Sequence, residues 1–550
     1  MNNYNNLKEL LFHALENFKT KDAFYKRNKD GYDTISFDTF ITDTLKLSAT
    51  LLDKGYSGKH IALIGENSYE WVVSYMAIVS ASAVVVPIDK ELTVKEILNI
   101  IKTSDSKIFF YSSSYDDAAL EAESELGVEL VMTDKPLSRH AHPSLRELID
   151  IQTDNSYLEK IKAVEIDNDA MCSIVYTSGT TGLSKGVMLS HTNMLTDVKA
   201  CFSIAKFGGN RFSVLPMHHT YEFTLGVLFS IAQGCATSIN NSIKYVAQNL
   251  KIFSPTDLII VPLIAETLYN AVWGTIRKSG KEKLVKRMIT ISNLLLKVGI
   301  DMRKVFFKKV HDSLGGKVHN IFCGGAHIDP AIARGYLDFG FYFNIGYGIT
   351  ECSPLIAGNI FFKRDKMDSC GKSIECNEIK IEDPNEDGEG HIIVKGKNVM
   401  LGYYKDQKTT DAVLIDGWFH TGDIGKYDAD GFLHITGRTK NLIVLKNGKN
   451  IYPEELEGYI YQIPYVKEVV VYAEGSSVGD EVSLGAEIFP NMERLEEDNI
   501  SDYNSVILNE VVNINKGLPY YKRIAHTTFR DSEFEKTTTK KIKRESRYGK

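Results

Sequence analysis

The chain has 550 residues and a mass of 61.7 kDa, more than one hydrophobic core usually serves, because domains run to roughly 100–200 residues. Its 43% hydrophobic and 25% charged residues are typical of a globular protein and exclude a disordered or fibrous chain. The 64 basic and 71 acidic residues give a net charge of −7. This balance argues against a general nucleic-acid binder, so no nucleic-acid partner is expected.

Seven cysteines are present without a Cys-x-x-Cys pair, and several lie in apolar runs. We therefore expect buried reduced thiols, not a disulfide framework or a zinc site. The N-terminal stretch resembles an amphipathic helix with acidic residues in it, not a signal peptide. The longest apolar stretch, around Met76–Ile88, is too short to cross a bilayer. These features predict a soluble, cytoplasmic protein.

Helical patterns and continuous apolar runs alternate along the first 350 residues. Apolar runs without alternation indicate strands covered on both faces, as in a parallel sheet. Helix-like segments separate most of them, so right-handed βαβ units are the simplest interpretation. The predicted helices are Phe37–Leu52, Asn67–Val79 and Val94–Lys102, and the predicted strands are His60–Ile64, Ala83–Pro87, Lys107–Tyr111, Met171–Tyr176, Asp257–Val261, Val318–Phe322 and Phe341–Ile345.

The pattern changes near Glu378, where short alternating strings separated by Gly and Asp predict an antiparallel β unit. After Arg438 the pattern is mixed, and about a hundred residues suffice for a small α+β domain. The predicted fold class is therefore α/β, with a large N-terminal domain of parallel-rich sheets, covering helices and a small antiparallel β unit over residues 1–437, and a small α+β C-terminal domain over residues 438–550. The elements predicted in the latter are strands at Leu442–Leu445, Val466–Tyr472 and Val482–Phe489 and a helix at Pro453–Tyr461.

The most specific motif is YTSGTTGLSKGV, from Tyr176 to Val187, which continues a predicted strand. Its hydroxyl residues, its glycines and Lys185 could direct amides, hydroxyls and one positive charge onto a polyphosphate. It is not a Walker loop, because Lys185 is followed by Gly186 instead of Ser or Thr. A glycine-rich turn without a ligand is the alternative, which the length of the string disfavours.

A second motif, GYGITE, begins at Gly346 after a predicted strand, a place where open α/β sheets bind ligands. Tyr347 could stack on a purine, Thr350 could bond a phosphate oxygen and Glu351 could hold Mg²⁺. The small-residue string Gly324–Ala326 could let a flat ring approach the backbone. A plain surface turn explains GYGITE about as well.

Three further strings are weaker. Asp423, in GWFHTGD, could accept from two ribose hydroxyls or could simply cap a turn. Arg438, in GRTKN, could share the ribose. The string from Glu535 to Arg544, with threonines between its lysines, is either a solvated basic tail or an ordered element.

Together and in this order, these strings resemble those of the adenylate-forming superfamily, which includes acyl- and aryl-CoA synthetases, peptide-synthetase adenylation domains and firefly luciferase. The resemblance covers essentially the whole chain and is greatest to bacterial long-chain fatty acyl-CoA synthetases. It implies a mobile C-terminal domain that pivots near Lys440. It also implies a catalytic Lys541, although the neighbouring Lys540 blurs that assignment by one position. The ATP-binding residues that it implies are Thr177, Ser178, Gly179, Thr180, Thr181, Gly182 and Lys185 for the β- and γ-phosphates, Gly325, Ala326, Gly346 and Tyr347 for adenine, Thr350 for the α-phosphate, Asp423 and Arg438 for the ribose, and Glu351 for Mg²⁺.

The resemblance implies an acid–thiol ligase that uses ATP and Mg²⁺, with CoA as co-substrate. The string LPMHH resembles the family's Pro-x-x-His stretch, which would place His219 beside the substrate carboxylate. An amino acid is disfavoured, because no aspartate suited to its amine is found nearby. A long segment between Thr267 and Val318 resembles the long-chain enzymes and favours a medium- or long-chain fatty acid. An aryl- or short-chain acid ligase, an acyl carrier protein as acceptor and a non-catalytic nucleotide-binding protein remain alternatives.

The segment 275–312 carries eleven basic and three acidic residues. Its apolar residues recur at three- and four-residue steps, which predicts an amphipathic helix or a pair of helices broken at Gly299. Its basic face is either solvated or docks an anionic partner, a membrane surface or an acidic carrier protein. The apolar stripe consists of Leu284, Met288, Ile291, Leu295, Val298, Met302, Phe306 and Val310.

Overall fold

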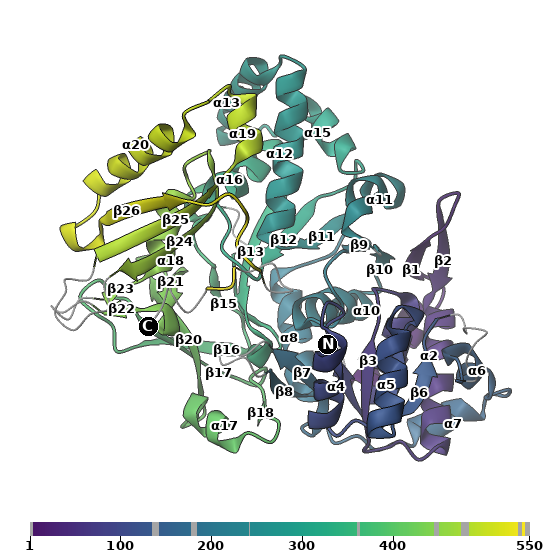
Figure 1. Ribbon diagram of the computed structural model, residues 1–550. Helices are drawn as coiled ribbons and strands as arrows, with labels where there is room; N and C mark the ends of the chain where they lie inside the picture. The colour runs from purple at the N-terminus through teal and green to yellow at the C-terminus, as the bar shows by residue number, and fades with distance from the viewer. Residues whose placement is uncertain are drawn as a thin grey trace.

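Two large, mostly parallel sheets with covering helices make up the N-terminal part of the protein, and a smaller α+β unit follows (Figure 1). The computed structural model describes residues 4–134, 142–177, 184–240, 242–359, 363–444, 450–474, 483–536 and 542–544. The predicted fold class is correct, including the antiparallel unit and the small C-terminal unit. The proposed division between residues 437 and 438 stays a prediction.

The first sheet has seven strands in the order β18-β8-β7-β4-β3-β5-β6. Five of them are parallel, as the uninterrupted apolar runs predict, and β8 and β18 extend one edge in antiparallel fashion. Helices α2 and α3 pack on one face, while α4 and α5 pack on the other. The strands are β3 (His60–Ile64), β4 (Val84–Pro87), β5 (Ile108–Tyr111), β6 (Glu129–Met132), β7 (Met171–Thr177), β8 (Lys185–Ser190) and β18 (Gly402–Tyr403), and the helices are α2 (Phe37–Asp53), α3 (Tyr69–Ser80), α4 (Val94–Thr103) and α5 (Asp116–Leu126).

The second sheet has nine strands in the order β15-β14-β13-β12-β11-β9-β10-β1-β2. Its six central strands, from β13 to β1, are parallel, and antiparallel strands close both edges. The main hydrophobic core lies between the two sheets and the helices that cover them. The strands are β1 (Asp22–Arg27), β2 (Tyr32–Ser36), β9 (Asn210–Ser213), β10 (Ala236–Ile239), β11 (Asp257–Ile260), β12 (Asn320–Gly324), β13 (Tyr342–Gly348), β14 (Leu355–Asn359) and β15 (Lys372–Ser373).

Other helices of this part lie between the strands or before them. A π-helix at Phe223–Leu228 links α9 to α10, a type of distortion that is frequent at functional sites. The helices are α1 (Leu7–Phe18), α6 (Leu145–Asp150), α7 (Ser156–Lys162), α8 (His191–Ile204), α9 (Thr220–Glu222), α10 (Phe229–Gln233), α11 (Val246–Phe253) and α16 (Pro330–Phe339), with 3₁₀ turns at Ser113–Tyr115, Ile243–Tyr245, Thr350–Cys352 and Arg364–Lys366.

The antiparallel unit and the C-terminal unit form separate sheets. The C-terminal unit also has a hydrophobic core of its own, which includes Leu456, Val469 and Ile507. The antiparallel unit consists of β16 (Asn377–Glu382), β17 (Gly390–Gly396), β19 (Leu414–Ile415), β20 (Trp418–Tyr427) and β21 (Leu433–Arg438), with α17 (Gln407–Val413). The remaining elements are β22 (Ile443–Val444), β23 (Asn450–Ile451), α18 (Pro453–Ile460), β24 (Val466–Glu474), β25 (Ser483–Pro490), α19 (Met492–Glu497), α20 (Tyr503–Lys516) and β26 (Ile524–Phe529), with 3₁₀ turns at Thr439–Asn441 and Tyr520–Lys522.

The long basic segment is not one helix. It follows α12 (Pro262–Lys278) as α13 (Glu282–Lys297), α14 (Arg303–Phe306) and α15 (Lys308–Ser313), and the helices lie at one edge of the molecule (Figure 1). Breaks fall at Gly280 and Gly299, whose φ angles of +67° and +84° favour glycine. The second break is the one that the sequence offers as an alternative.

Two further predictions concern the cysteines and the membrane. All seven cysteines are free, five of them buried and two partly buried, as expected for reduced thiols. Among the helices that the structure describes, none combines the length and the apolar character needed to cross a bilayer.

Candidate active site

Tyr347, Asp423 and Arg438 form one hydrogen-bonded group although they are far apart in the sequence. Asp423 and Arg438 are direct partners in the β20–β21 ladder, and the Arg438 Nε lies 3.0 Å from the Asp423 Oδ1. The buried Tyr347 hydroxyl donates to the other carboxylate oxygen at 2.7 Å. Burial and the adjacent Asp423 raise the pKa of Tyr347 far above its ordinary value, so its hydroxyl stays a donor. The strings GYGITE, TGD and GRTKN thus meet at one place.

Asp423 does not cap a turn. It lies within β20, with only 4% of its surface exposed, and the preceding Gly422 takes a φ of +73° where the pairing of β20 with β17 shifts register. A carboxylate buried at this level needs partners, which Tyr347 and Arg438 supply. Each carboxylate oxygen has a second lone-pair direction, so Asp423 could accept further hydrogen bonds from a ligand.

Glu351 and Lys185 both contact Tyr403. The Tyr403 hydroxyl donates to the Glu351 Oε1 at 3.0 Å, and the Lys185 Nζ lies 5.1 Å from the centre of the same ring. Burial raises the pKa of Glu351 above its ordinary value, and the charge of Asp423 adds to that shift. A nearby cation would favour the charged form of this carboxylate, as expected at a metal or phosphate site.

The serine, threonine and glycine string connects two paired strands. Thr177 is the last residue of β7 and pairs with Lys185, the first residue of β8. The predicted phosphate-binding residues between them (Ser178, Gly179, Thr180, Thr181 and Gly182) lie outside the described residues. The structure therefore places the two ends of this string. Lys185, at its second end, contacts Tyr403, whose hydroxyl binds Glu351.

Glycines keep the neighbouring strand ends open. A Cβ on Gly324, at the end of β12, would lie 3.1 Å from the Gly346 carbonyl oxygen and 3.4 Å from the Tyr221 hydroxyl. Gly325 has a φ of +87°, and both it and Ala326 are exposed. Gly346 lies within the strand instead of after it, contrary to the prediction, because β13 continues to Gly348 and pairs with β14. Thr350 follows in a 3₁₀ turn and is partly exposed.

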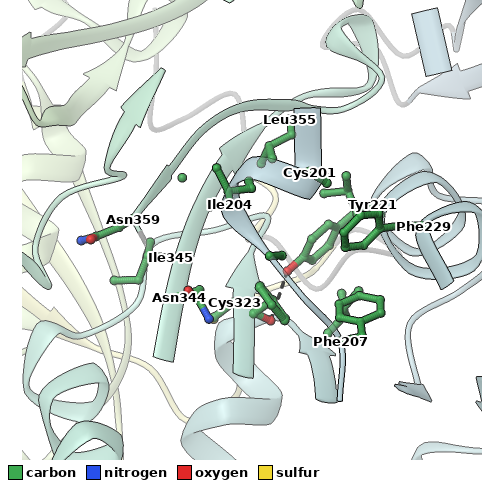
Figure 2. A pocket seen from close by; sticks show the side chains of 16 residues that line it. Cys201, Ile204, Phe207, Tyr221, Phe229, Cys323, Asn344, Ile345, Leu355 and Asn359 are labelled. Carbon is green, nitrogen blue, oxygen red and sulfur yellow. Dashed lines mark hydrogen bonds between the residues drawn. The ribbon is translucent and has the colours of Figure 1, made fainter. Parts of the chain in front are cut away.

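An apolar pocket adjoins Gly346 (Figure 2). It has about 490 Å³ of space free of atoms, part of it open to solvent. Tyr221 reaches across it, and its hydroxyl donates to the Phe322 carbonyl at 3.2 Å. The wall is formed largely by aliphatic, aromatic and thiol side chains, among them Cys201, Ile204, Phe207, Leu225, Phe229, Ile259, Cys323, Ile345 and Leu355.

His219 lies two residues before Tyr221 but is not among the residues that line this pocket. Its ring is 4.1 Å from that of His218, whose Nε2 lies 3.4 Å from the Asp89 Oδ1. Ligand atoms of Asp89, His218 and His219 all lie within 4.8 Å of one another. Two imidazoles and a carboxylate suit a transition metal better than Mg²⁺, for which Glu351 is the better donor.

The predicted catalytic Lys541 and its neighbour Lys540 lie outside the described residues. The residues that flank them are placed: Lys536 and Ile542 pair as an antiparallel bridge, and Arg544 donates to the Val471 carbonyl at 2.9 Å. The pKa of Glu96 on α4 is lowered mainly by its hydrogen bonds with Thr93, and the charge of Lys543 adds to that shift. Lys440, the predicted pivot, is exposed in the 3₁₀ turn that follows β21.

Three groups of residues escaped the sequence analysis: Tyr403, the pair Asp89 and His218, and the pocket wall around Tyr221. Tyr403 belongs to a two-residue strand that pairs with β8, and no periodicity marks it. The wall comes from segments scattered between Cys201 and Asn359. The only signal for Tyr221 was its closeness to the Pro-x-x-His stretch.

Comparisons with known proteins identify the family of the chain. The family model of the AMP-binding enzyme matches residues 11–404, and that of the AMP-binding enzyme C-terminal domain matches residues 440–550. Long-chain-fatty-acid–CoA ligase 5 of Rattus norvegicus is 30% identical over 488 residues, which cover 82% of this chain and 70% of that protein. The chloroplastic long-chain-fatty-acid–acyl-carrier-protein ligase AEE15 of Arabidopsis thaliana is 29% identical over 523 residues, covering 79% and 69%.

Solved structures show the same fold. The anthranilate CoA ligase AuaEII in complex with anthranoyl-AMP superposes with a TM-score of 0.78 at 20% identity, over 98% of this chain and 95% of that one. The o-succinylbenzoate CoA synthetase of Bacillus subtilis in complex with ATP and a magnesium ion gives 0.72 at 21% identity, over 97% and 98%. The resemblance found in the sequence motifs is thereby confirmed. The chain belongs to the AMP-binding enzyme family and is an adenylate-forming acid ligase.

Proposed function

We propose that this protein activates a medium- or long-chain fatty acid with ATP and transfers the acyl group to the thiol of CoA. The observation that carries the choice of acid is the apolar pocket, which reaches Gly346 while the next residue, Tyr347, contacts the Asp423 group. An acyl chain in the pocket and a nucleotide at Asp423 would then lie next to each other along β13. This arrangement suits a reaction that joins a carboxylate to the α-phosphate.

The nucleotide would be held by residues from both ends of the N-terminal part. We assign the ribose to Asp423 and Arg438, which form the ion pair described above. Adenine would lie between Tyr347 and the exposed Gly325–Ala326. The loop from Thr177 to Gly182, with Lys185, would take the β- and γ-phosphates. The exposed guanidinium of Arg438, held on one side by Asp423, would donate to the ribose or to solvent.

The chemistry is two displacements. A carboxylate oxygen forms a bond to the α-phosphorus of ATP, and the bond from that phosphorus to the bridging oxygen breaks, so that pyrophosphate leaves with its electron pair. A thiolate then attacks the acyl carbon, and AMP leaves. The first step brings two anions together, so positive charge is needed beside the α-phosphate, and we assign it to Lys541.

Glu351 is the residue that would hold Mg²⁺. Its carboxylate is a hard oxygen donor that accepts a hydrogen bond from the Tyr403 hydroxyl, and Lys185 contacts the same tyrosine. When bound, Mg²⁺ would supply charge that neutralises the phosphate oxygens. Thr350, one residue earlier, is assigned to the α-phosphate, and His219 to the neighbourhood of the substrate carboxylate.

The pocket wall favours an alkyl chain over a polar acid. Each buried methylene contributes about 0.8 kcal/mol, close to a fourfold gain in affinity, for as long as the chain stays in the pocket. A charged or amino group there would lose its hydration without a charged partner among the residues that line the wall. An aryl or short-chain acid remains the second candidate, since the pocket also has an aromatic wall that includes Phe207 and Phe229.

A pyrophosphate-exchange assay with straight-chain acids of two to eighteen carbons tests this proposal. We expect kcat/KM to rise with chain length and then level off, and thioester to appear with CoA. Greatest activity with benzoates or acetate would refute the fatty-acid assignment. Product only with acyl carrier protein would replace CoA as acceptor, and nucleotide binding without exchange for any acid would favour a non-catalytic role. A cytoplasmic location stays a prediction.

A further inference from the structure

Helix α13 exposes apolar side chains to solvent along one face. On α13, Leu284, Ile291 and Leu294 are 53%, 51% and 58% exposed, and Val298, its C-cap residue, is 71% exposed. They follow one another at steps of seven, three and four residues, so on a helix of 3.6 residues per turn they form one stripe. We call this stripe the outer face of α13. Single exposed apolar residues are ordinary, but three along one helix with a fourth at its C-cap are not.

The outer face is not the side by which α13 packs on the protein. Val285, Met288 and Ile289 contact the main core from the opposite side, and Ser292 is the only fully buried residue of the helix. The apolar stripe read from the sequence therefore mixes two faces, with Met288 inside and Ile291 outside. The face with Val285, Met288 and Ile289 packs α13 against the protein, and the outer face makes no part of that packing.

Basic side chains accompany the outer face. Lys283 and Arg287 are exposed on the same helix, and Arg287 lies one turn from both Leu284 and Ile291. Other cations of the segment are engaged by acids: Lys286 by Glu282 at 2.7 Å and Lys308 by Asp312 at 2.7 Å. Exposed cations that extend the basic character around this helix are Lys278, Lys281, Lys297, Lys304 and Lys309.

We propose that the outer face of α13 docks the protein on the surface of an anionic lipid bilayer. Apolar side chains that project from a helix with cations beside them match a bilayer interface, where the alkyl groups enter the acyl region and the cations meet lipid phosphates. The chain is acidic overall, so the positive charge of this segment is a local feature. An acidic carrier protein would satisfy the cations but leaves the exposure of Leu294 and Val298 unexplained.

Sedimentation of the full chain with vesicles tests the proposal. We expect binding to vesicles of phosphatidylcholine with about 30% phosphatidylglycerol and at least tenfold weaker binding to phosphatidylcholine alone. Binding should also fall in about 0.5 M salt, because screening shortens the reach of the cations. Equal binding to both vesicles, or none to either, would overturn the proposal.

Two pairs of substitutions separate the two contributions. Leu294→Ser with Val298→Ser removes alkyl groups, and Lys283→Glu with Arg287→Glu reverses charge; each pair should weaken vesicle binding about tenfold or more. The matched apolar control is Leu508→Ser with Val512→Ser, which are 39% and 52% exposed on α20. The matched charge control is Lys29→Glu with Lys251→Glu, both exposed elsewhere.

The controls should bind as the unaltered protein does, and all variants should keep its rate with a short soluble acid. Equal loss in test and control pairs would overturn the proposal. So would a charge pair that leaves vesicle binding unchanged but raises the KM for acyl carrier protein tenfold, since the face would then belong to a protein. The outcome does not depend on which acid the enzyme activates, so it can fail while the proposed function stands.

Discussion

Replacing Asp423 by alanine tests the assignment of the ribose site. Asp423 is buried, accepts from the Tyr347 hydroxyl at 2.7 Å and pairs with Arg438 at 3.0 Å. Asp423→Ala leaves a buried tyrosine hydroxyl without its acceptor, which costs about 1–3 kcal/mol of stability. The lost ion pair adds little, about 0–1 kcal/mol, because Arg438 is 41% exposed.

The effect on ATP should be larger than the effect on folding. A carboxylate that accepts from two vicinal hydroxyls makes two hydrogen bonds to a charged group, each worth about 1.5–3 kcal/mol. The lower figure for both gives about 3 kcal/mol, or about a hundredfold rise in KM for ATP at 1.4 kcal/mol per factor of ten. KM for the acid should stay within about threefold, since neither Asp423 nor Arg438 is among the residues that line the pocket.

Pyrophosphate exchange with ATP varied at saturating acid gives the two constants, and urea unfolding gives the stability. Tyr347→Phe is the matched control: it removes the same internal hydrogen bond but keeps the carboxylate and the ring. It should lose similar stability while KM for ATP changes by less than about threefold. If Tyr347→Phe raised KM for ATP as much as Asp423→Ala does, or if neither raised it, Asp423 would be a structural residue of β20.

Four further predictions test other parts of the site. Glu351→Gln keeps a partner for Tyr403 and removes the charge, so half-maximal exchange should need about tenfold more Mg²⁺; an unchanged Mg²⁺ titration would remove Glu351 from the metal. Lys541→Ala should slow adenylation about 10²–10³-fold and spare thioester formation from supplied acyl-adenylate; a larger loss in Lys540→Ala would shift the register by one. Leu225→Trp should fill the pocket and move the preferred acid to shorter chains, and an unchanged preference would place the acyl chain elsewhere. Burial, helped by the charge of Asp329, raises the pKa of Glu266 to about 7, so the folded state keeps a proton that the unfolded state loses above about pH 4.3. The free energy of unfolding should therefore fall as the pH rises toward 7. Urea unfolding should show that Glu266→Gln is more stable than the unaltered protein at pH 8 but not at pH 4.

The sequence predicts the interior of the sheets well because burial leaves a strong signal. The strand His60–Ile64 has the predicted bounds, and its last four residues are buried among helices on both faces. Strand ends are less certain, since pairing decides them. β13 continues past Ile345 to Gly348 because β14 returns beside it, and GYGITE alone carries no sign of that partner.

The site was predicted in pieces whose assembly only the fold shows. Tyr347 and Asp423 are 76 residues apart, and the ladder register that sets Asp423 against Arg438 depends on the shift near Gly425. The interpretation of TGD as a turn is wrong because Gly422, with its left-handed φ, lies within a strand that bends, and glycines take this conformation there as well as in turns. Tyr403 joins two predicted residues, Lys185 and Glu351, but belongs to neither string.

The basic segment shows the limit of hydrophobic periodicity. A single apolar stripe predicts one buried face, whereas α13 is apolar toward the core at Met288 and toward solvent at Ile291. Both sets satisfy three- and four-residue spacing, so a count of spacings cannot separate them. Whether an apolar face of a helix is exposed depends on the elements that pack around the helix, so the sequence of the helix alone does not predict it.

The contacts between the C-terminal unit and the rest bear on the proposed domain rotation. The ion pair from Arg277 on α12 to Glu497 on α19 spans 2.9 Å, and its side chains are 27% and 33% exposed. Such a pair is worth about 0–1 kcal/mol, so breaking it costs little. Closer to the proposed pivot, a Cβ on Gly437 would lie 2.7 Å from that of Tyr452, so the backbone of β21 and the start of α18 touch directly. If the chain pivots near Lys440 as proposed, a few residues there absorb the change in dihedral angles, and surface pairs such as Arg277–Glu497 separate at low cost.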